Sequence, residues 1–513
     1  MELFTRSSAH DVFRNTRKRR CDDARLTLYG AKNAVCSGQI VLREHGEFDI
    51  TGIEFSGFSA PFIVSENDVG YYFQDYIKYN DGEYPDPLSD AVSVHVPAES
   101  SQSVWITVNV KPEALSGLCT FTVTVKTSVS DFTVPASVRV FGVTVPDADK
   151  SEFSLEYFLD PFTSLAGERW GDDREKFLSS YCESLAMIRN NSLDVQIIPL
   201  LCDAKSKRIS ETEWDLDFSY VGKYVDFMTA RVPTKYIAIR STIASVNGDT
   251  LPVIGYDGKV TWEKYGTKDT NAWFYAYIHG IYEYFRSRGM EKMLLIRLQD
   301  EPHYTECWKW ARQICREAAP GVHCGEPLDE HPSGLGLQGY IDQYIPRINV
   351  YEEGADYYDR MRKQGSTLWV YSCCFPEEPW FINKFIDHPH VHSRLMSWGC
   401  YARGITGFLH WGYNYWSDTS LYGTAPGARF KGDGFIVYPD KENLRVKPST
   451  RLLATAEGIV DYELLKIVEK KDPAAAMAIC ESLVRRFNEY DDDPDAVDAA
   501  HVRLLSAAEE ASL

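Results

Sequence analysis

The sequence has no long hydrophobic run, and it is short of positive charge. No stretch approaches the roughly 20 apolar residues of a membrane-spanning helix, so we expect no membrane insertion. The 513 residues contain 54 Lys and Arg against 74 Asp and Glu, a net charge of −20. An acidic chain repels the phosphates of nucleic acids, and the one basic run, Arg14 to Arg20, is too short to offset this. The charge balance argues against a nucleic-acid partner and favours a neutral substrate.

Motifs for metals, cofactors and secretion are also missing. The 12 cysteines form no Cys-x-x-Cys pair and no Cys/His cluster with zinc spacing, so we expect no metal. No glycine-rich phosphate loop follows a predicted strand, and we expect no cofactor. The N-terminal residues MELFTRSSAHDVFRNTRKRR lack the apolar segment of a secretory signal. The sequence as given predicts a cytoplasmic protein and leaves open whether it forms a homo-oligomer.

Aromatic residues, in contrast, are abundant. They make up 13 % of the chain, with 12 Trp and 31 Tyr. A large core accounts for most of them, although flat rings also stack on sugars. With 44 % apolar and 25 % charged residues, the composition is that of a globular protein and excludes a disordered chain, a collagen and a coiled-coil rod. The length predicts roughly two to four domains.

The first 150 residues have the pattern of an all-β domain. Phe121, Val123 and Val125 alternate with threonines, which is the period of a strand with one buried face. Six runs separated by turn residues are predicted as strands: Arg25–Tyr29, Gly38–Arg43, Phe48–Phe55, Val104–Val110, Cys119–Thr127 and Ser137–Val145. Six or more such strands predict a β-sandwich over residues 1–150.

From about Ser151, strand and helix patterns alternate. The predicted strands are Phe153–Leu159, Asp194–Leu200, Tyr236–Thr242, Met293–Leu298, Val322–Gly325, Ile345–Tyr351, Thr367–Ser372 and Ile405–Trp411. The clearest helical pattern is Ala272–Arg288, where Trp273, Tyr277, Ile281 and Phe285 share one face. Eight strand–helix units over about 300 residues predict a (β/α)8 TIM barrel over residues 151–470. A C-terminal helical tail is predicted over residues 471–513.

The strongest catalytic candidates are Asp300 and Glu301. In a barrel the active site lies at the carboxyl ends of the strands, and this pair follows the apolar run of strand four. Pro302 ends that strand because it has no N–H to donate. Two adjacent carboxylates in a poorly solvated pocket titrate together and one pKa is raised, which a proton donor at neutral pH requires. The alternative interpretation is a solvated turn with two acids.

The segment FLHWGYNYW at the end of strand eight is the second candidate. Four aromatic residues in six cannot all be core where a strand ends, so we expect rings that stack on a sugar. Asn414 and His410 are expected to bond hydroxyl groups. A hydrophobic plug at the barrel mouth is the alternative.

The pair and the aromatic mouth together suggest a glycosidase. Retaining enzymes usually place two carboxyl groups ~5–5.5 Å apart, on opposite sides of the scissile bond. Neighbours on one strand cannot easily flank a sugar ring in that way, but they can serve one side of it. Glu301 would protonate the leaving oxygen. Asp300 would accept the N–H of a 2-acetamido group, whose carbonyl oxygen attacks.

The chain resembles glycoside hydrolase family 123, the β-N-acetylgalactosaminidases, along most of its length. The resemblance rests on YPDPL (Tyr84–Leu88), VWITVNVKPEALSG (Val104–Gly117), the Asp300–Glu301 pair, WGYNYW (Trp411–Trp416) and STRLLATAEGIVDYELL (Ser449–Leu465). It implies a β-sandwich joined to a (β/α)8 barrel, and retaining, substrate-assisted hydrolysis with Asp300 as stabiliser and Glu301 as acid/base. The predicted enzyme removes a terminal β-linked 2-acetamido sugar, N-acetylgalactosamine in that family, from a small glycan.

The resemblance also implies further contacts. Tyr371 is expected to bond the acetamido carbonyl oxygen, and Trp411 and Trp416 to wall the subsite. Asn349, Tyr351 and Asn414 are expected to reach hydroxyl groups, and Asp160 either holds a remote hydroxyl or caps a helix. Arg451, Asp461, Tyr462 and Glu463 in the last helix are expected to be structural.

Two other functions stay open. In the first, a retaining glycosidase acts on a non-acetamido sugar, with Glu301 as acid/base and Glu377 or Glu378 after strand seven as the nucleophile. In the second, the protein binds carbohydrate without catalysis. A 2-fluoro sugar would label Glu377 or Glu378 under the first, and binding without turnover would mark the second.

Overall fold

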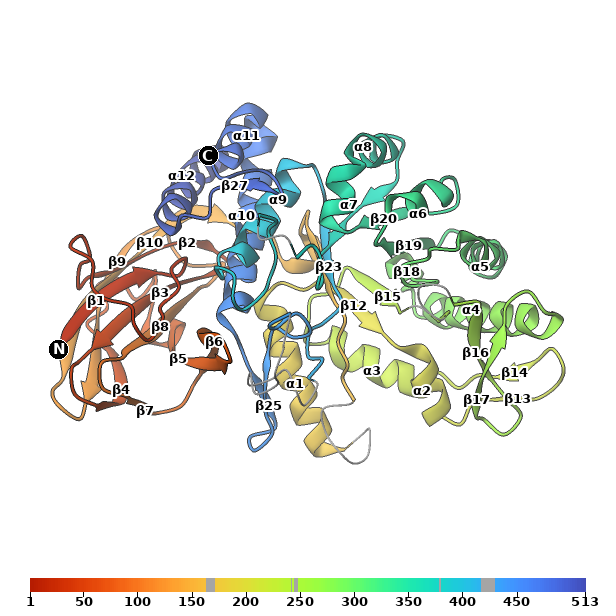
Figure 1. Ribbon diagram of the computed structural model, residues 1–513, viewed down its shortest axis with the longest axis horizontal. Coiled ribbons are helices and arrows are strands. Elements are labelled where there is room, and N and C mark those ends of the chain that lie inside the picture. Colours follow the sequence, from red (N-terminus) through yellow and green to blue (C-terminus); the bar gives the residue numbers. More distant parts are fainter. Residues whose placement is uncertain (163–170, 241, 244–247, 378–379, 417–429) are drawn as a thin grey trace.

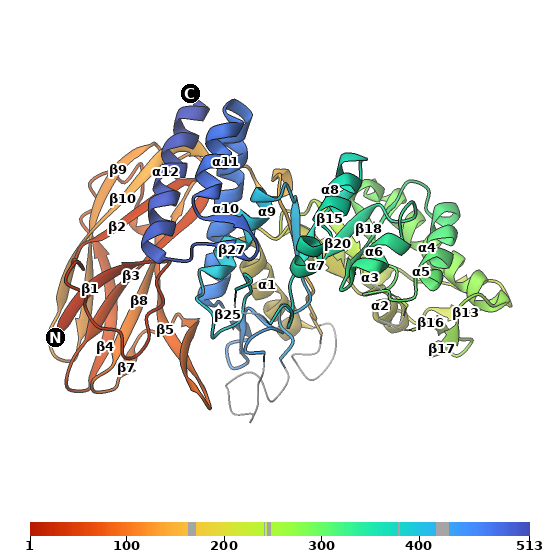
Figure 2. The same ribbon diagram turned by 45° about the horizontal axis from the view of Figure 1, so that its top comes forward.

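The computed structural model describes residues 1–162, 171–240, 242–243, 248–377, 380–416 and 430–513. The N-terminal sheets lie on one side of the molecule, and a ring of parallel strands with its helices lies on the other, as Figures 1 and 2 show. The last helices of the chain stand next to the N-terminal sheets and the first part of the ring (Figure 2).

Two five-stranded sheets form the N-terminal region and share one apolar core. The first has the order β1 (Glu2–Ser7), β3 (Ala34–Arg43), β8 (Ser101–Val110), β5 (Val69–Tyr79) and β6 (Gly82–Ser89). The second has the order β2 (Leu26–Lys32), β10 (Phe132–Thr144), β9 (Gly117–Thr127), β4 (Phe48–Ser56) and β7 (Val94–Val96). In β9, Phe121, Val123 and Val125 are buried as the alternation predicts. All six predicted strands are present, and β1, β5, β6 and β7 are additional.

The following strands form a nearly closed parallel ring. Its order is β21 (Thr367–Leu368), β20 (Gln343–Pro346), β19 (His323–Leu328), β18 (Leu294–Ile296), β15 (Tyr236–Ile239), β12 (Ser192–Val195), β11 (Ser154–Tyr157), β23 (Gly407–His410) and β22 (Val370–Tyr371). Only Trp369 separates β21 from β22, so these two segments occupy the seventh position of the ring together. A parallel bridge between Arg347 and Tyr371 narrows the remaining gap. The strands thus form a nearly closed parallel barrel, and Trp369 interrupts its seventh position.

Helices link successive strands around the outside of the ring (Figure 1). They are α1 (Asp172–Met187), α2 (Ile197–Asp203), α3 (Ser219–Thr229), α4 (Lys268–Ser287), α5 (Thr305–Ala318), α6 (His331–Gly336), α7 (Ile348–Glu353), α8 (Ala355–Lys363) and α9 (His392–Ala402). In α4, Trp273, Tyr277, Ile281 and Phe285 are buried, as their spacing predicts. The described residues also form four two-stranded sheets: β13–β14 (Lys207–Arg208, Trp214–Asp215), β16–β17 (Thr250–Ile254, Val260–Lys264), β24–β25 (Tyr438–Asp440, Arg445–Lys447) and β26–β27 (Val484–Arg486, Glu489–Tyr490).

Two predicted strands are wrong in their second half. The run Asp194–Leu200 leaves β12 at Val195 and enters α2 at Ile197. The run Ile345–Tyr351 leaves β20 at Pro346 and enters α7 at Ile348. In both places apolar residues continue from the strand into the helix. A continuous apolar run does not distinguish a buried strand from a buried helix, so the pattern hides the boundary.

Helix α10 (Thr450–Lys471) is buried along most of its length and joins the parts of the molecule. It packs on α9, on the tail helices α11 (Pro473–Glu481) and α12 (Pro494–Ser512), and on β3 and β6 of the first sheet. Arg451 forms two hydrogen bonds of 2.9 Å with the carboxylate of Asp86 on β6. Glu457 accepts the hydroxyl proton of Ser37 on β3 at 2.6 Å. The motifs YPDPL and STRLL thus meet in one buried ion pair.

The tail is helical, as predicted, apart from the β26–β27 hairpin. The acidic run Tyr490–Asp495 contains the start of α12: Asp493 is the N-cap and accepts the N–H of Ala496. Among the helices of the described residues, none combines the length and apolar character that crossing a bilayer requires.

Candidate active site

A buried ion pair lies inside the barrel just before the carboxylate pair. Arg297, directly after β18, donates to Glu156 Oε2 of β11 at 2.8 Å and to Gln343 Oε1 of β20 at 2.7 Å. The side chains of Arg297 and Glu156 are fully buried. Removing either would leave an uncompensated buried charge. Arg297 thus cross-links three strands, which explains a charged residue in an otherwise apolar run.

Glu326 fixes the backbone that leads to the pair. It lies on β19, and its Oε1 accepts the N–H groups of Leu298 and Gln299, the second at 2.9 Å. Burial raises the pKa of Glu326 well above its ordinary value. The chain then turns at Glu301, whose φ of +46° lies in the left-handed region. A non-glycine residue takes this conformation only where its surroundings hold it, and such positions cluster at functional sites.

Asp300 lies in poorly solvated surroundings close to another ion pair. Arg240, directly after β15, bonds Asp194 of β12, with 3.0 Å between Nε and Oδ1. Burial and the adjacent charge of Glu301 raise the pKa of Asp300 to about 7, although the charge of Arg240 opposes the shift. The carboxyl group of Asp300 therefore gains or loses its proton near neutral pH.

Glu301 is bonded to the end of strand seven. Tyr371, the last residue of β22, donates its hydroxyl proton to Glu301 Oε1 at 2.5 Å. Burial raises the pKa of Glu301, and the Tyr371 hydrogen bond opposes this. Asp329 raises the pKa further, while Arg347 and His303 lower it. The structure thus brings Tyr371 to the pair, and its hydrogen-bond partner there is Glu301.

A third acid, Asp433, lies at the mouth beside strand eight. Trp411 is half-buried and donates its indole N–H to Asp433 Oδ2 at 2.9 Å. The backbone N–H of Cys374 also donates to this carboxylate, and burial raises the pKa of Asp433 to about 7. Asp433 is 6 % exposed, and its Oδ1 has no hydrogen-bond partner among the described residues. A buried acceptor without a partner suits a ligand hydroxyl group.

His410 forms a buried layer with Tyr157. Their rings stack with centroids 5.5 Å apart at 11°. Lys384 donates to the Tyr157 hydroxyl at 2.6 Å. Burial and the charge of Lys384 lower the pKa of His410 well below its ordinary value, so the ring is neutral. Its predicted contact with a sugar hydroxyl stays a prediction.

Asn414, Asp160 and Trp416 lie together beside Tyr181 of α1. The side-chain amide of Asn414 donates to the Asp160 carbonyl and to the Tyr181 hydroxyl, each at 2.7 Å. Its Oδ1 accepts the N–H of Asp160 at 2.9 Å. Trp416 stacks on Tyr181 and donates to the carbonyl of Val437 at 2.9 Å. The substrate contacts predicted for these three residues stay predictions and would have to coexist with these bonds.

Asn349 and Tyr351 lie on helix α7, so their expected position at the end of a strand is wrong. Asn349 Oδ1 accepts a hydrogen bond from Arg347 Nε at 2.8 Å. The charge of Arg347 in turn lowers the pKa of Glu301, so Asn349 is connected to the acid through Arg347. Tyr351 is fully buried, and its hydroxyl donates to Asp359 at 3.1 Å. An apolar run that crosses from strand to helix produced both errors.

Five polar residues at the mouth escaped the sequence patterns: Asp194, Arg240, His303, Asp329 and Asp433. The first four lie on strands two to five or shortly after them, so a reading of every polar residue at a strand end would have found them. His303 Nε2 lies 2.8 Å from Asp329 Oδ2, and this bond raises the pKa of His303. Asp433 comes late in the segment after β23, and no local pattern marks it.

One group of residues outside the mouth has the donor set of a metal site. The ligand atoms of His10, Asp495 and Asp498 lie within 4.8 Å of one another. Arg19 already bonds two of them, His10 at 3.3 Å and Asp495 at 3.2 Å. A guanidinium group therefore supplies the positive charge, and we assign no metal to this group.

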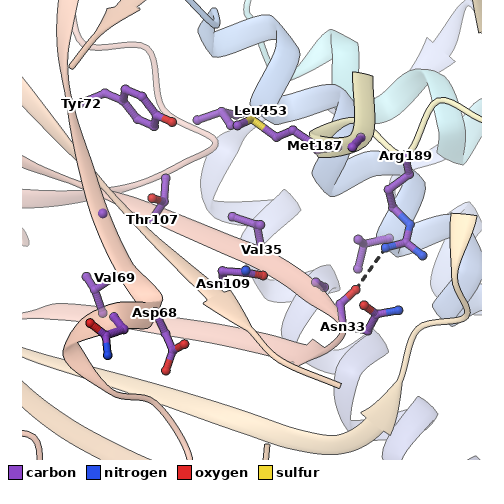
Figure 3. A pocket seen from close by; sticks show the side chains of 16 residues that line it. Asn33, Val35, Asp68, Val69, Tyr72, Thr107, Asn109, Met187, Arg189 and Leu453 are labelled. Atoms are coloured by element: carbon purple, nitrogen blue, oxygen red, sulfur yellow. Dashed lines mark hydrogen bonds between the residues drawn. The ribbon is translucent and has the colours of Figure 1, made fainter. Parts of the chain in front are cut away.

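A cavity of about 510 Å³ lies between the N-terminal sheets and helices α1 and α10 (Figure 3). Tyr72 and Asn109 line it from the sheets and Leu453 lines it from α10. The only acid among its lining residues, Asp68, is paired with Lys111 at 2.7 Å. The described lining of this cavity offers no second acid, so it lacks a pair of carboxyl groups like the one after strand four.

Comparisons with known proteins relate the chain to one family of glycoside hydrolases. The family model for the catalytic domain of glycoside hydrolase 123 matches residues 166–468. A solved family 123 glycoside hydrolase from Clostridium perfringens, described for glycolipid glycan hydrolysis, has a TM-score of 0.80 at 14 % identity. The match covers 99 % of this chain and 97 % of that one, and at this identity it shows the fold alone.

The other structural likenesses are weak. A β-glucuronidase from Bacteroides uniformis and one from Dictyoglomus thermophilum each have a TM-score of 0.34 at 8 % identity. They cover 85 % and 89 % of this chain, and 51 % and 97 % of their own chains, and they carry no argument. No curated protein matches the chain.

Proposed function

Because the chain belongs to glycoside hydrolase family 123, we propose that it removes a terminal β-linked 2-acetamido sugar, N-acetylgalactosamine, from a glycan with retention of configuration. The proposed reaction uses the acetamido group of the substrate as its nucleophile. We assign the strand ring to the (β/α)8 class, which its strand order supports when β21 and β22 are taken as one interrupted seventh strand. We assign the N-terminal sheets to a β-sandwich, which their shared core supports.

The observation that carries this proposal is the placement of two adjacent acids with different surroundings. Asp300 is next to Arg240, and Glu301 is turned by its positive φ towards Tyr371. Two neighbours on one strand serve one side of a sugar, so one acid is free to donate a proton while the other binds a group of the substrate. Different surroundings push the pKa values of two carboxyl groups apart, which is typical of a pair in which one acts as acid and the other as base.

In the first proposed step the acetamido carbonyl oxygen bonds to the anomeric carbon. The glycosidic bond breaks, and Glu301 gives its proton to the leaving oxygen. Burial raises the pKa of Glu301, which is the direction that a proton donor requires. Asp300, as a carboxylate, accepts the acetamido N–H and stabilises the positive charge of the oxazolinium ring.

In the second step Glu301, now a carboxylate, takes a proton from water. The water oxygen attacks the anomeric carbon, and the oxazolinium ring opens to restore the acetamido group. Two displacements at one carbon leave its configuration unchanged. Trp411, directly after strand eight, would pack on the sugar face. Asp433, which Trp411 bonds, would accept a hydroxyl proton at Oδ1, the atom without a hydrogen-bond partner among the described residues.

The alternative nucleophiles have less support. Glu378 lies outside the described residues, and Glu377 is half-buried in the segment after β22. Neither alternative gives Asp300 a task, although it is directly adjacent to Glu301 in a buried part of the mouth.

Hydrolysis of four aryl β-glycosides tests the proposal: N-acetylgalactosaminide, N-acetylglucosaminide, galactoside and glucoside. We expect release from 2-acetamido sugars alone, with loss of turnover in both Asp300→Asn and Glu301→Gln. Glu377→Gln is the matched control and is expected to keep wild-type turnover. Release from sugars with a free 2-hydroxyl, or loss of turnover in the control, would favour a carboxylate nucleophile instead.

A further inference from the structure

Two adjacent cysteines, Cys373 and Cys374, follow Tyr371 at the barrel mouth. Their sulfur atoms lie 3.9 Å apart, and both are free thiols of intermediate exposure. Cys315 also lies beside Cys324, but both of these are buried. The pair 373–374 therefore combines a short distance between sulfur atoms with access to solvent.

The segment that carries the two thiols is bonded to two acids of the mouth. The N–H of Cys374 donates to Asp433, and Tyr371, three residues earlier, donates to Glu301 at 2.5 Å. The side-chain amide of Asn383 holds the carbonyl of Cys373 at 3.0 Å. A change in the backbone at residues 373–374 would therefore disturb the contact of Cys374 with Asp433 and, through Tyr371, the hydrogen bond to Glu301.

The surroundings give the two thiols different reactivity. The hydrogen bond with Cys373 lowers the pKa of Cys374, as does the charge of Arg347, while burial and Asp433 oppose this. The same bond and burial raise the pKa of Cys373. The thiolate is the reactive form of cysteine, so Cys374 is the attacking sulfur and Cys373 is the thiol that resolves the product.

We propose that Cys373 and Cys374 form a reversible oxidation site that responds to peroxide and switches off the neighbouring active site. The Cys374 thiolate attacks one peroxide oxygen, the O–O bond breaks, and a sulfenic acid and hydroxide result; the hydroxide takes up the proton that the Cys374 thiol released and leaves as water. Cys373 then attacks the Cys374 sulfur, the S–O bond breaks, and the hydroxyl group leaves with a proton as a second water. Two thiols lose two electrons to one hydrogen peroxide, and a disulfide forms.

Forming this bond must move the backbone. The sulfur atoms come from 3.9 Å to about 2.05 Å. Adjacent Cα atoms are about 3.8 Å apart, less than the roughly 4.4 Å at which ordinary disulfides begin. Strained and exposed disulfides are the easily reduced ones, so the oxidation is reversible. A displacement of about 1 Å at a reacting group costs roughly 100-fold in rate.

The effect of oxidation on turnover rests on the proposed function. The oxidation itself does not, and the mass of a tryptic peptide tests it. Trypsin releases Gln364–Lys384, in which Cys373 and Cys374 are the only cysteines. After treatment of the whole protein with hydrogen peroxide, we expect this peptide to be lighter by two hydrogen atoms and to regain them with dithiothreitol. An unchanged peptide, at a dose that oxidises the exposed Cys21, would overturn the site whether or not the protein hydrolyses glycosides.

Turnover tests the switch, with each variant compared before and after peroxide. The wild type and the control Cys21→Ser are expected to lose roughly 100-fold and to recover with dithiothreitol. Cys373→Ser and Cys374→Ser cannot close the bond, and we expect dimedone to trap a sulfenic acid at Cys374 in Cys373→Ser. A disulfide that forms in the wild type without loss of turnover would overturn the switch but not the oxidation site.

Discussion

At the scale of single residues, the bond from Tyr371 to Glu301 determines how long the acid keeps its proton. The hydroxyl hydrogen bond favours the carboxylate and so opposes the rise that burial causes in the pKa of Glu301. Tyr371→Phe removes the bond, and we expect the basic limb of kcat/KM to move to higher pH. The pH profile of an aryl glycoside measures this. An unmoved basic limb would assign Tyr371 to the substrate instead, as the family resemblance implies.

Asp300 carries a stability cost that depends on pH. Its pKa is about 7 in the folded protein against an ordinary 3.8, so the folded state binds the proton more tightly. The ionised group is therefore destabilising above pH 7, and the cost disappears as the pH falls towards 4. We expect Asp300→Asn to raise the free energy of unfolding at pH 8 by on the order of 1–3 kcal/mol and to change it little at pH 4.

Urea denaturation at the two pH values measures this difference. The exposed Asp215 gives the matched control Asp215→Asn, for which we expect no such pH dependence. Equal shifts for Asp300→Asn at both pH values would contradict the buried, charge-coupled description of this carboxyl group.

How far the site can be predicted depends on the distance in sequence between its parts. Asp300 and Glu301 follow an apolar strand directly, and that local pattern is sufficient to find them. Asp433 becomes visible only when the long segment after β23 folds back onto Trp411. Asp194 and Arg240 each lie at a strand end, which a local pattern can show, but their pairing arises only from tertiary packing.

At the scale of elements, helix α10 depends on a network of buried charges. Arg394 of α9 bonds Asp461 at 2.7 Å and Glu457 at 2.9 Å. Burial alone would raise the pKa of Asp461, but the charge of Arg394 outweighs it and holds the pKa below the ordinary value. Such a network is stable while every charge has a partner, and it is costly to break.

We therefore expect Arg394→Met to lower the free energy of unfolding by about 3–5 kcal/mol, because two buried carboxylates lose the guanidinium charge that they share. Lys268→Met is the control. It breaks an ion pair with Glu211 in which both side chains are highly exposed, at 77 % and 80 %, and is expected to leave stability nearly unchanged. Chemical denaturation of both variants tests the difference, and similar losses would contradict the account.

Secondary structure is predicted well where periodicity is strong and poorly where it is not. Strand β9 follows from alternation, and helix α4 follows from the spacing of four buried aromatic and aliphatic residues. The two strand errors have one cause, an apolar run that continues past the end of a strand. The split of strand seven at Trp369 could not be predicted, because the residues on both sides are good strand formers.

At the scale of the whole molecule, the N-terminal sheets are connected to the active site through Arg451. This residue bonds Asp86 of β6 and also the carbonyl groups of Gly432 and Phe435, at 2.9 and 3.0 Å. These two carbonyls flank Asp433. The sheets therefore position an acid of the mouth as well as covering helix α10.

Asp86→Asn in the full chain tests this connection. The substitution leaves the buried Arg451 charge without its carboxylate, and we expect a lower melting temperature and roughly a 10-fold or greater fall in kcat/KM. Kinetics are measured well below the melting temperature, so that loss of folding does not enter. Unchanged kcat/KM in the folded variant would mean that the sheets support the barrel without shaping its mouth.

The most direct test of substrate assistance is the rate for aryl N-acylgalactosaminides that carry zero, one, two or three fluorine atoms on the acyl methyl group. Fluorine withdraws electrons from the carbonyl oxygen, so kcat/KM must fall steeply with each atom if that oxygen attacks the anomeric carbon. We predict this steep fall for the wild type. Rates that do not depend on the number of fluorine atoms would contradict the roles proposed for Asp300 and Glu301.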